Sequence, residues 1–441
     1  MRRIVTGFVA VMGLFAVALG GTAGASVPPP GFAELISVSS GGAQGDGDSQ
    51  GAAVSGDGRF VVFSSQASNL VRHDTNEAFD VFVRDRRTDT TERVSVSTLG
   101  RQGNDNSGLQ SRSAISADGR FVAFSSAASN FAGAADVNGN EDVFVRDRLL
   151  GTTELISVGL DGMAAEGSEP SISADGRYVS FTSFGDNLVP GDTNFASDVF
   201  VRDRQLNATE RVSVRSDGSE VSQGSFSSQI SAEGGVVAFD SFSDDLVPGD
   251  TNQSVDVFVH DRQTAVTEGI STRTSCDPTQ GDICGNSLVG SLTPDGRFIA
   301  FSSTQQGLVP GDDDFFSDAF LVDRQTGSIV LVSQSSTGVK GNDDSVAPLV
   351  RADGQAVVFS SRASNLVRND TNQQQDVFRR DLTTDVTKRI AADTGQFPFP
   401  TMADAITTDA ERVAIETRAA LLPEPSCCGP FTSDVYLIRR R

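Results

Sequence analysis

The sequence predicts an all-β protein, a seven-bladed β-propeller of four-stranded blades, on three observations. A segment of about 60 residues recurs along the chain, as in repeat architectures. Each copy contains four short runs of β-branched and aromatic residues, separated by turn signals and without a helical period. The two ends of the chain supply complementary parts of one further copy. Four-stranded units in series are typical of propeller blades.

The third copy shows the four expected strands and the turn between the first two. Its first strand is the short segment 171–173, and Asp175-Gly176 then predicts a tight turn, because glycine reaches positive φ without strain. The other expected strands are the segments 178–183, 198–203 and 209–214. The turn residue recurs in the remaining copies at Asp57, Asp118, Glu233, Asp295, Asp353 and Asp409.

The ends of the chain predict how the ring closes. Residues 34–39 match a fourth strand but precede the first full copy, whereas the last copy, 400–441, stops after its third strand. We expect the N-terminal strand to complete this last blade, because an unpaired sheet edge promotes aggregation. Residues 26–441 then form a single propeller domain.

The N-terminus has the features of a secretory signal peptide over residues 1–25. Two arginines precede an apolar run, and Ala23-Gly24-Ala25 offers a small-residue cleavage site. A retained N-terminal anchor is the alternative, although the run is short for a membrane span. We expect a protein secreted to the extracellular or periplasmic space, with no membrane insertion after signal cleavage.

The net charge of −23 limits the classes of partner. An acidic surface repels nucleic acid and anionic lipid, so we expect no nucleic-acid partner. The same surface tolerates divalent cations. We expect the protein to be monomeric.

Four cysteines are available in a chain expected to meet an oxidising compartment. Three pairings are possible. The short spacing of Cys276 and Cys284 within one loop favours a local disulfide, which leaves Cys427 and Cys428 as a vicinal bridge or reduced. A zinc site is disfavoured, because the sequence has no C-x-x-C pattern.

The repeat resembles a known family. The string S-x-D-G-R, an apolar strand and then D-V-F-V-x-D looks like the TolB-type β-propeller repeat, a relative of WD-type repeats. The resemblance covers about residues 32–441 and implies the propeller fold. It does not imply TolB's function, because the separate N-terminal domain of TolB is missing and the loops between second and third strands are longer.

These long loops carry oxygen-bearing side chains at alternating positions in six copies. Calcium loops begin in this way, because calcium takes about 6–8 oxygen ligands. The candidate sets are Asp74, Asn76 and Asp80; Asp136, Asn138, Asn140 and Asp142; Asp192, Asn194 and Asp198; Asp250, Asn252 and Asp256; Asp312, Asp314 and Asp318; and Asp370, Asn372 and Asp376. The alternative is that they fix turns by local hydrogen bonds, since no loop ends in a bidentate glutamate. A bound calcium ion would be structural.

Other repeated residues predict packing and not chemistry. Two series of phenylalanines recur in register and are expected between the blades: Phe63, Phe124, Phe181, Phe239, Phe301 and Phe359, and Phe82, Phe144, Phe200, Phe258, Phe320 and Phe378. The repeated Arg-Asp pair, as at Arg84-Asp85, predicts blade contacts and turn bonds. The match of 47–51 to G-x-S-x-G lacks the strand–turn–helix context, so no catalytic residue is assigned.

We therefore favour a non-enzymatic binding or scaffold propeller. Its acidic face, from which the long loops emerge, would recognise a protein, a peptide or a cell-envelope glycan. One alternative is a polysaccharide-acting hydrolase or lyase, which requires non-repeated polar residues that converge on one pocket. The other is a TolB-like accessory protein of the cell envelope.

Overall fold

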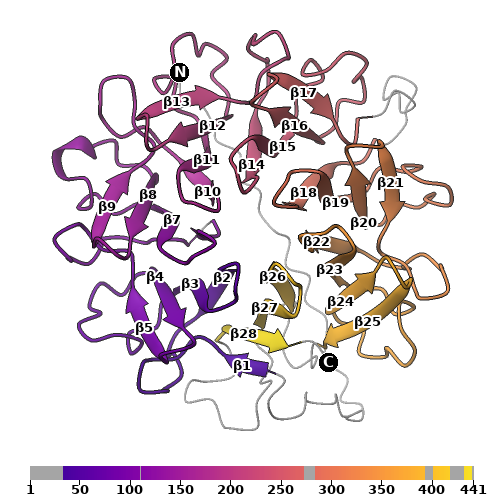
Figure 1. Cartoon of the computed structure of the whole chain (residues 1–441), viewed down its shortest axis with the longest axis horizontal. Helices are drawn as coiled ribbons and strands as arrows, with labels where there is room; N and C mark the ends of the chain where they lie inside the picture. The colour runs from indigo at the N-terminus through magenta and orange to yellow at the C-terminus, as the bar shows by residue number, and fades with distance from the viewer. Residues whose placement is uncertain (1–32, 110, 273–283, 393–400, 418–431, 440–441) are drawn as a thin grey trace, which may run out of the picture.

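The computed structural model describes residues 33–109, 111–272, 284–392, 401–417 and 432–439. Within these ranges the strands form seven four-stranded antiparallel sheets, arranged as the blades of a ring (Figure 1). The predicted seven-bladed propeller is confirmed. None of the described residues forms a helix that is long and apolar enough to cross a membrane. The predicted signal peptide, 1–25, lies outside the described residues.

Each of blades 1 to 6 is a continuous segment whose strands follow one another from the channel outwards. Blades 1 to 3 consist of β2 (Ser49–Val54), β3 (Phe60–Ser65), β4 (Asp80–Asp85) and β5 (Thr90–Arg93); β6 (Ala114–Ile115), β7 (Phe121–Ser126), β8 (Asp142–Asp147) and β9 (Thr152–Leu155); and β10 (Ser168–Ile172), β11 (Tyr178–Ser183), β12 (Asp198–Asp203) and β13 (Ala208–Arg211). A short 3-10 helix, η1 (Gly133–Ala135), lies in the long loop of blade 2.

Blades 4 to 6 repeat the same order. They consist of β14 (Ser225–Ile230), β15 (Val236–Ser241), β16 (Asp256–Asp261) and β17 (Val266–Gly269); β18 (Ser287–Leu292), β19 (Phe298–Ser303), β20 (Asp318–Asp323) and β21 (Ser328–Leu331); and β22 (Ser345–Val350), β23 (Ala356–Ser361), β24 (Asp376–Asp381) and β25 (Val386–Ala391).

Blade 7 joins the two ends of the chain. Strands β26 (Met402–Ile406), β27 (Arg412–Thr417) and β28 (Asp434–Arg439) are completed by β1 (Ala33–Leu35). Strand β1 pairs antiparallel with β28, with Leu35 opposite Tyr436, and the Ile36 amide continues the pairing by donating to the Val435 carbonyl oxygen at 2.9 Å. The predicted closure of the ring by the N-terminal strand is confirmed.

The two phenylalanine series form the core between blades, as predicted. All twelve rings are fully buried, and the two members of each blade stack on neighbouring strands, as Phe181 and Phe200 do at a centroid distance of 5.8 Å. Because the same pair recurs in blades 1 to 6, each sheet packs on the next with the same apolar interface.

The repeated Arg-Asp pairs make bonds at the outer strands. The strand-end aspartate accepts from an arginine that follows the Asp-Gly turn, as in the contact between Arg177 and Asp203 at 2.6 Å. The next arginine reaches back to a fourth-strand glutamate of the preceding blade, as Arg204 does to Glu154 at 2.8 Å. These contacts confirm the structural role predicted for the pair.

The fourth strands end earlier than the sequence indicates. In blade 1, β5 stops at Arg93 because the Ser95 hydroxyl takes over the backbone's role: it accepts from the Val81 amide and donates to the Asp80 carboxylate at 2.6 Å. In blade 6 the same position is Ala391, which has no hydroxyl, and β25 extends to that residue.

Candidate functional site

Two carboxylates meet at the start of the third strand in blades 1 to 6. One is the strand aspartate: Asp80, Asp142, Asp198, Asp256, Asp318 or Asp376. The other lies six residues earlier in the long loop: Asp74, Asp136, Asp192, Asp250, Asp312 or Asp370. We call each such set a carboxylate pair. Every strand aspartate is fully buried, so each pair needs a cation or a proton to offset the like charges.

The asparagines between these aspartates act as hydrogen-bond donors. The side-chain amide of Asn194, for example, donates to Asp198 at 3.0 Å, while its oxygen accepts from the Ala196 amide at 2.9 Å. Asn76, Asn138, Asn252 and Asn372 make the same two kinds of contact. Their oxygens are engaged in local turns, and Asn140 is exposed.

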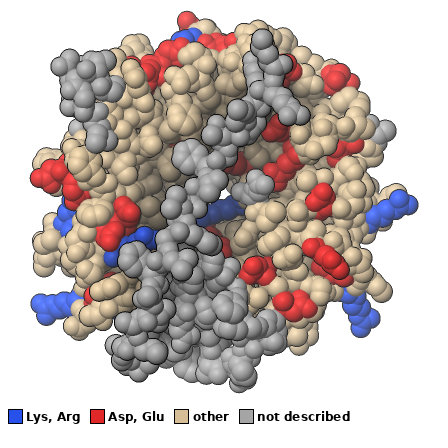
Figure 2. All heavy atoms as spheres, turned by 180° about the vertical axis from the view of Figure 1, so that it is seen from behind, with Lys and Arg blue, Asp and Glu red and all other residues tan. Residues whose placement is uncertain are grey.

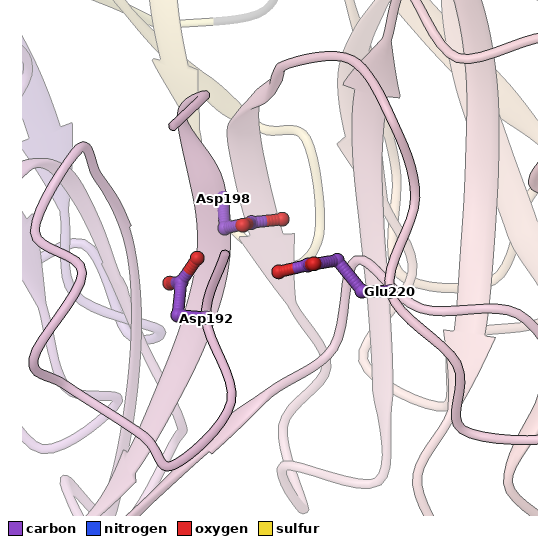
Figure 3. Close-up of side chains that lie close together, drawn as sticks. All are labelled: Asp192, Asp198 and Glu220. Atoms are coloured by element: carbon purple, nitrogen blue, oxygen red, sulfur yellow. The ribbon is translucent and has the colours of Figure 1, made fainter. Parts of the chain in front are cut away.

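Blade 3 brings three carboxylates together. Ligand oxygens of Asp192, Asp198 and Glu220 lie within 4.8 Å of one another, a spacing that could hold a metal ion (Figure 3). Arg211 of β13 already contacts all three, with Nη1 at 3.2 Å from Asp192, 3.2 Å from Asp198 and 2.6 Å from Glu220. The guanidinium therefore offsets part of the negative charge of this cluster.

The pKa values in blade 3 follow from these contacts. Burial raises the pKa of Asp192 to about 6, and the charge of Asp198 acts in the same direction. Burial acts against ionisation of Glu220 as well, but hydrogen bonds from Thr193 and Arg211 lower its pKa to about 2. The arginine thus favours the ionised form of the carboxylate that it contacts most closely.

Three other blades also supply a cation to the carboxylate pair. Arg93 in blade 1 lies 3.2 Å from Asp74 and 3.1 Å from Asp80. Arg389 in blade 6 lies 3.0 Å from Asp370 and 2.7 Å from Asp376. In blade 5, Lys340 contacts Asp318 and lies 2.8 Å from Asp314.

Blades 2 and 4 lack the arginine. Register places Leu155 and Gly269 where Arg211 stands in blade 3, since each is paired with the equivalent phenylalanine of the third strand. Burial, together with the neighbouring aspartate, raises the pKa of Asp142 in blade 2 and of Asp250 in blade 4 to about 7. One carboxyl oxygen of each has no hydrogen-bond partner among the described residues.

A second group of acidic residues is spread over three neighbouring blades. Glu141, Glu166, Glu169 and Asp240 come from blades 2 to 4, each near the end of its blade where the long loops leave. Glu169 sits at the bulge of β10 with φ of 53°, and its carboxylate accepts from the Ser227 amide at 2.8 Å and from Thr182 at 3.1 Å. We call these four residues the channel acids.

The channel acids influence one another's protonation. Burial raises the pKa of Glu141, and the charges of Glu166 and Glu169 raise it further. Burial also raises the pKa of Asp240 well above its usual range, with a contribution from Glu169. No lysine or arginine of the described residues forms an ion pair with any of the four. Sequence reasoning missed this group, whose signal was confined to Glu141 and Glu169, which stand where the other blades have uncharged residues.

The innermost strands line a central cavity of approximately 300 Å³. As the sequence predicts, its wall is mainly small and uncharged, with Ala52, Ser171 and Gln229 among the lining residues. Arg112 is the exception: it crosses from blade 2 to blade 7 and contacts the buried Asp404 at 3.2 Å. The cavity wall therefore offers a paired arginine and no free cluster of acids among the described residues.

On the face drawn in Figure 2, Asp and Glu side chains are spread around the ring, with Lys and Arg mostly towards its edge.

Ser49, within the G-x-S-x-G match, is buried and shares a hydrogen bond with Ser65 at 2.9 Å. Of the cysteines, only Cys284 belongs to the described residues, so the pairing with Cys276 stays a prediction.

Comparison with known proteins supports the fold and no more. No family model and no curated protein matches the sequence. Among solved structures, an oligogalacturonate lyase in complex with manganese is similar, at a TM-score of 0.52 and 11% identity over 94% of this chain and 92% of that one. The propeller-bearing chain of a prolyl endopeptidase gives a TM-score of 0.50 at 11% identity, with 84% of this chain and 46% of that chain covered.

TolB from Acinetobacter baumannii is more distant, at a TM-score of 0.40 and 16% identity over 80% of this chain and 65% of TolB. The chain thus shares its fold with the oligogalacturonate lyase and the prolyl endopeptidase. At these identities the likeness concerns the fold alone.

Proposed function

We propose that this protein is a secreted, non-enzymatic binding propeller that recognises a cationic segment of a protein or peptide at the channel acids. The supporting observation is that these four carboxylates lie on the long-loop side of blades 2 to 4, influence one another's pKa values and have no cationic partner among the described residues. The carboxylate pairs of blades 1, 3, 5 and 6 are occupied by an arginine or a lysine, so they contribute mainly to the fold.

Charge and geometry both favour a cationic ligand. Glu141, Glu166 and Glu169 are partly exposed, so a lysine or arginine side chain can reach them. Bringing a cation to a group of desolvated carboxylates removes their mutual repulsion, which gives both affinity and orientation. The net charge of −23 would add long-range attraction for a basic partner.

Calcium belongs to this proposal as a structural ion of the acidic loops. Which loops bind calcium depends on which blades already place an arginine or a lysine at their carboxylate pair.

The binding proposal is tested with the purified protein and fluorescent octapeptides of lysine, of arginine and of glutamate. We expect the basic peptides to bind, with affinity that falls as salt rises, and the glutamate peptide not to bind. A triple variant, Glu141→Gln, Glu166→Gln and Glu169→Gln, should lower the affinity at least tenfold.

The matched control removes three exposed acids elsewhere: Glu77→Gln, Glu233→Gln and Glu411→Gln. This variant loses the same charge, so it should bind as the wild type does. Equal loss in both variants would show that net charge alone attracts the peptides, and the assignment to the channel acids would fail. Binding of an uncharged envelope glycan in place of the peptides would also contradict it.

A polysaccharide-acting enzyme is the second candidate, favoured by one observation. Asp240 has a strongly raised pKa, while its neighbour Glu169 accepts two hydrogen bonds, and two carboxyls in contrasting environments are the usual acid and base of glycoside hydrolysis. Asp240 is only 1% exposed, which argues against contact with a substrate. Reducing-end release from neutral polysaccharides, abolished by Glu169→Gln, would support the enzyme.

The similarity to oligogalacturonate lyases does not strengthen this candidate. Oligogalacturonate is a polyanion, and the channel acids would repel it.

A further inference from the structure

Blade 2 differs from its neighbours in how its carboxylate pair is neutralised. Asp136 and Asp142 are 5% and 0% exposed, and their carboxyl groups are in contact. In blades 1, 3 and 6 a guanidinium nitrogen lies within 3.2 Å of both members of the equivalent pair. The same buried geometry therefore exists in blade 2 without its cation.

No other described side chain takes over the role of the arginine. The fourth-strand position is Leu155, opposite Phe144 as Arg211 is opposite Phe200. The loop position that supplies Lys340 in blade 5 is Ala164 in blade 2, since both residues form the same kind of isolated bridge after the fourth strand. At both positions where other blades carry a positive side chain, blade 2 therefore has an apolar residue.

The strand aspartate of blade 2 has an oxygen available for a ligand. Its Oδ1 accepts from Asn138 at 3.0 Å and from Ser157 at 3.3 Å, whereas its buried Oδ2 has no partner among the described residues. A buried carboxylate oxygen without a donor is costly, so this oxygen needs either a proton shared with Asp136 or a bound cation.

We infer that blade 2 binds one calcium ion between Asp136 and Asp142, in the position that arginine occupies in blades 1, 3 and 6. Carboxylate oxygens are the preferred ligands of this hard cation. Val137, Gly139 and Asn140 of the same loop are exposed, so water can complete the shell. Calcium accepts such an irregular set of ligands more readily than magnesium, which demands near-octahedral geometry.

Blade 4 is not included in this inference. Its pair, Asp250 and Asp256, also lacks the arginine, but Gln305 donates to Asp256 at 2.6 Å and the loop that follows the fourth strand lies outside the described residues.

The test counts bound calcium per chain by equilibrium dialysis of the purified protein. Leu155→Arg places an arginine at the fourth-strand position, as in blade 3, and should lower the count by one ion relative to the wild type. Asp142→Asn removes a ligand with little change of shape and should also lower it by one. Leu331→Arg is the matched control: it makes the same change at the equivalent position of blade 5, where Lys340 already serves, and should leave the count unchanged.

Melting temperature provides the second measurement. Adding 1 mM calcium after chelation should raise it less in Leu155→Arg than in the wild type, because one stabilising site is lost. The inference is overturned if Leu155→Arg binds as many ions as the wild type, or if Leu331→Arg loses an ion as well.

Discussion

Blades 2 and 3 have the same four strands, the same stacked phenylalanines and the same buried carboxylate pair, but they neutralise that pair differently. Blade 3 places Arg211 between Asp192 and Asp198, whereas blade 2 has Leu155 at the equivalent position. The backbone geometry is held by the repeat, so the side chains at two positions, on the fourth strand and in the loop that follows it, decide whether the pair receives a cation from within the chain. Departures from the repeat are therefore the places to look for ligands.

We expect the largest loss of stability when the arginine of blade 3 is removed. Arg211→Leu would leave the buried Asp198 and the half-buried Asp192 and Glu220 as like charges without a cation, and we expect the free energy of unfolding to fall by about 3 to 5 kcal/mol. Since three carboxylates then remain within metal-ligating distance, calcium should restore part of the loss. Urea denaturation with calcium and with chelator measures both effects.

The exposed Arg87 serves as the control for this variant. Arg87→Leu removes the same charge and should change stability by no more than about 0.5 kcal/mol. A similar small effect for Arg211→Leu would show that blade 3 does not depend on its arginine.

The next effect concerns the serine that ends the fourth strand. Ser213 donates to Asp198 at 2.6 Å and accepts from the Val199 amide at 3.0 Å. Ser213→Ala removes both bonds, and we expect a loss of about 1.5 to 3 kcal/mol, since one bond is to a buried charge. Blade 6 has alanine there already, so Ala391→Ser should not produce an equal loss; denaturation midpoints compare the two.

A pH-dependent effect on stability is expected for Asp240, one of the channel acids. The pKa of Asp240 is raised well above its unfolded value, so the folded state retains a proton that the unfolded state releases. Its contribution to stability is present below about pH 4 and is lost as pH rises through the folded pKa.

Asp240→Asn abolishes that titration. We expect the variant to be more stable than the wild type at pH 8 by about 1 to 3 kcal/mol, and the advantage to disappear towards pH 4. Stability curves at several pH values provide the measurement, and an advantage that grows as pH falls would contradict the assigned direction.

The smallest effect is expected for the ion pairs between blades at the surface. Glu154 contacts Arg204 of the next blade at 2.8 Å but keeps 37% of its side chain exposed. Glu154→Gln should cost about 0 to 1 kcal/mol, and high salt should reduce the difference further. A loss comparable to that of Arg211→Leu would mean that these pairs, and not the buried ones, hold the blades together.

The repeat made most of the fold predictable. The recurrence of Asp-Gly turns, of the phenylalanine pair and of D-V-F-V-x-D predicted the blades, and the incomplete last copy predicted the pairing of β1 with β28. These features depend on local patterns that each copy repeats.

The charge partners were not predictable in the same way. Arg93, Arg211 and Arg389 differ from Leu155 and Gly269 in the sequence, but only the register of the fourth strand shows that these residues face the carboxylate pair. The channel acids come from three blades, so their proximity depends on the closed ring. The sequence therefore offered six loops as calcium candidates, with the loop from Asp136 to Asp142 closest to the calcium pattern, although four of the others already contain a cation.

Diffraction from crystals grown with calcium, compared with crystals soaked in manganese, tests the central claim most directly. We predict an ion, and an anomalous peak on manganese exchange, between Asp136 and Asp142, with none among Asp192, Asp198 and Glu220, where Arg211 lies. An ion in the blade 3 cluster with Arg211 displaced, and none in blade 2, would contradict the account.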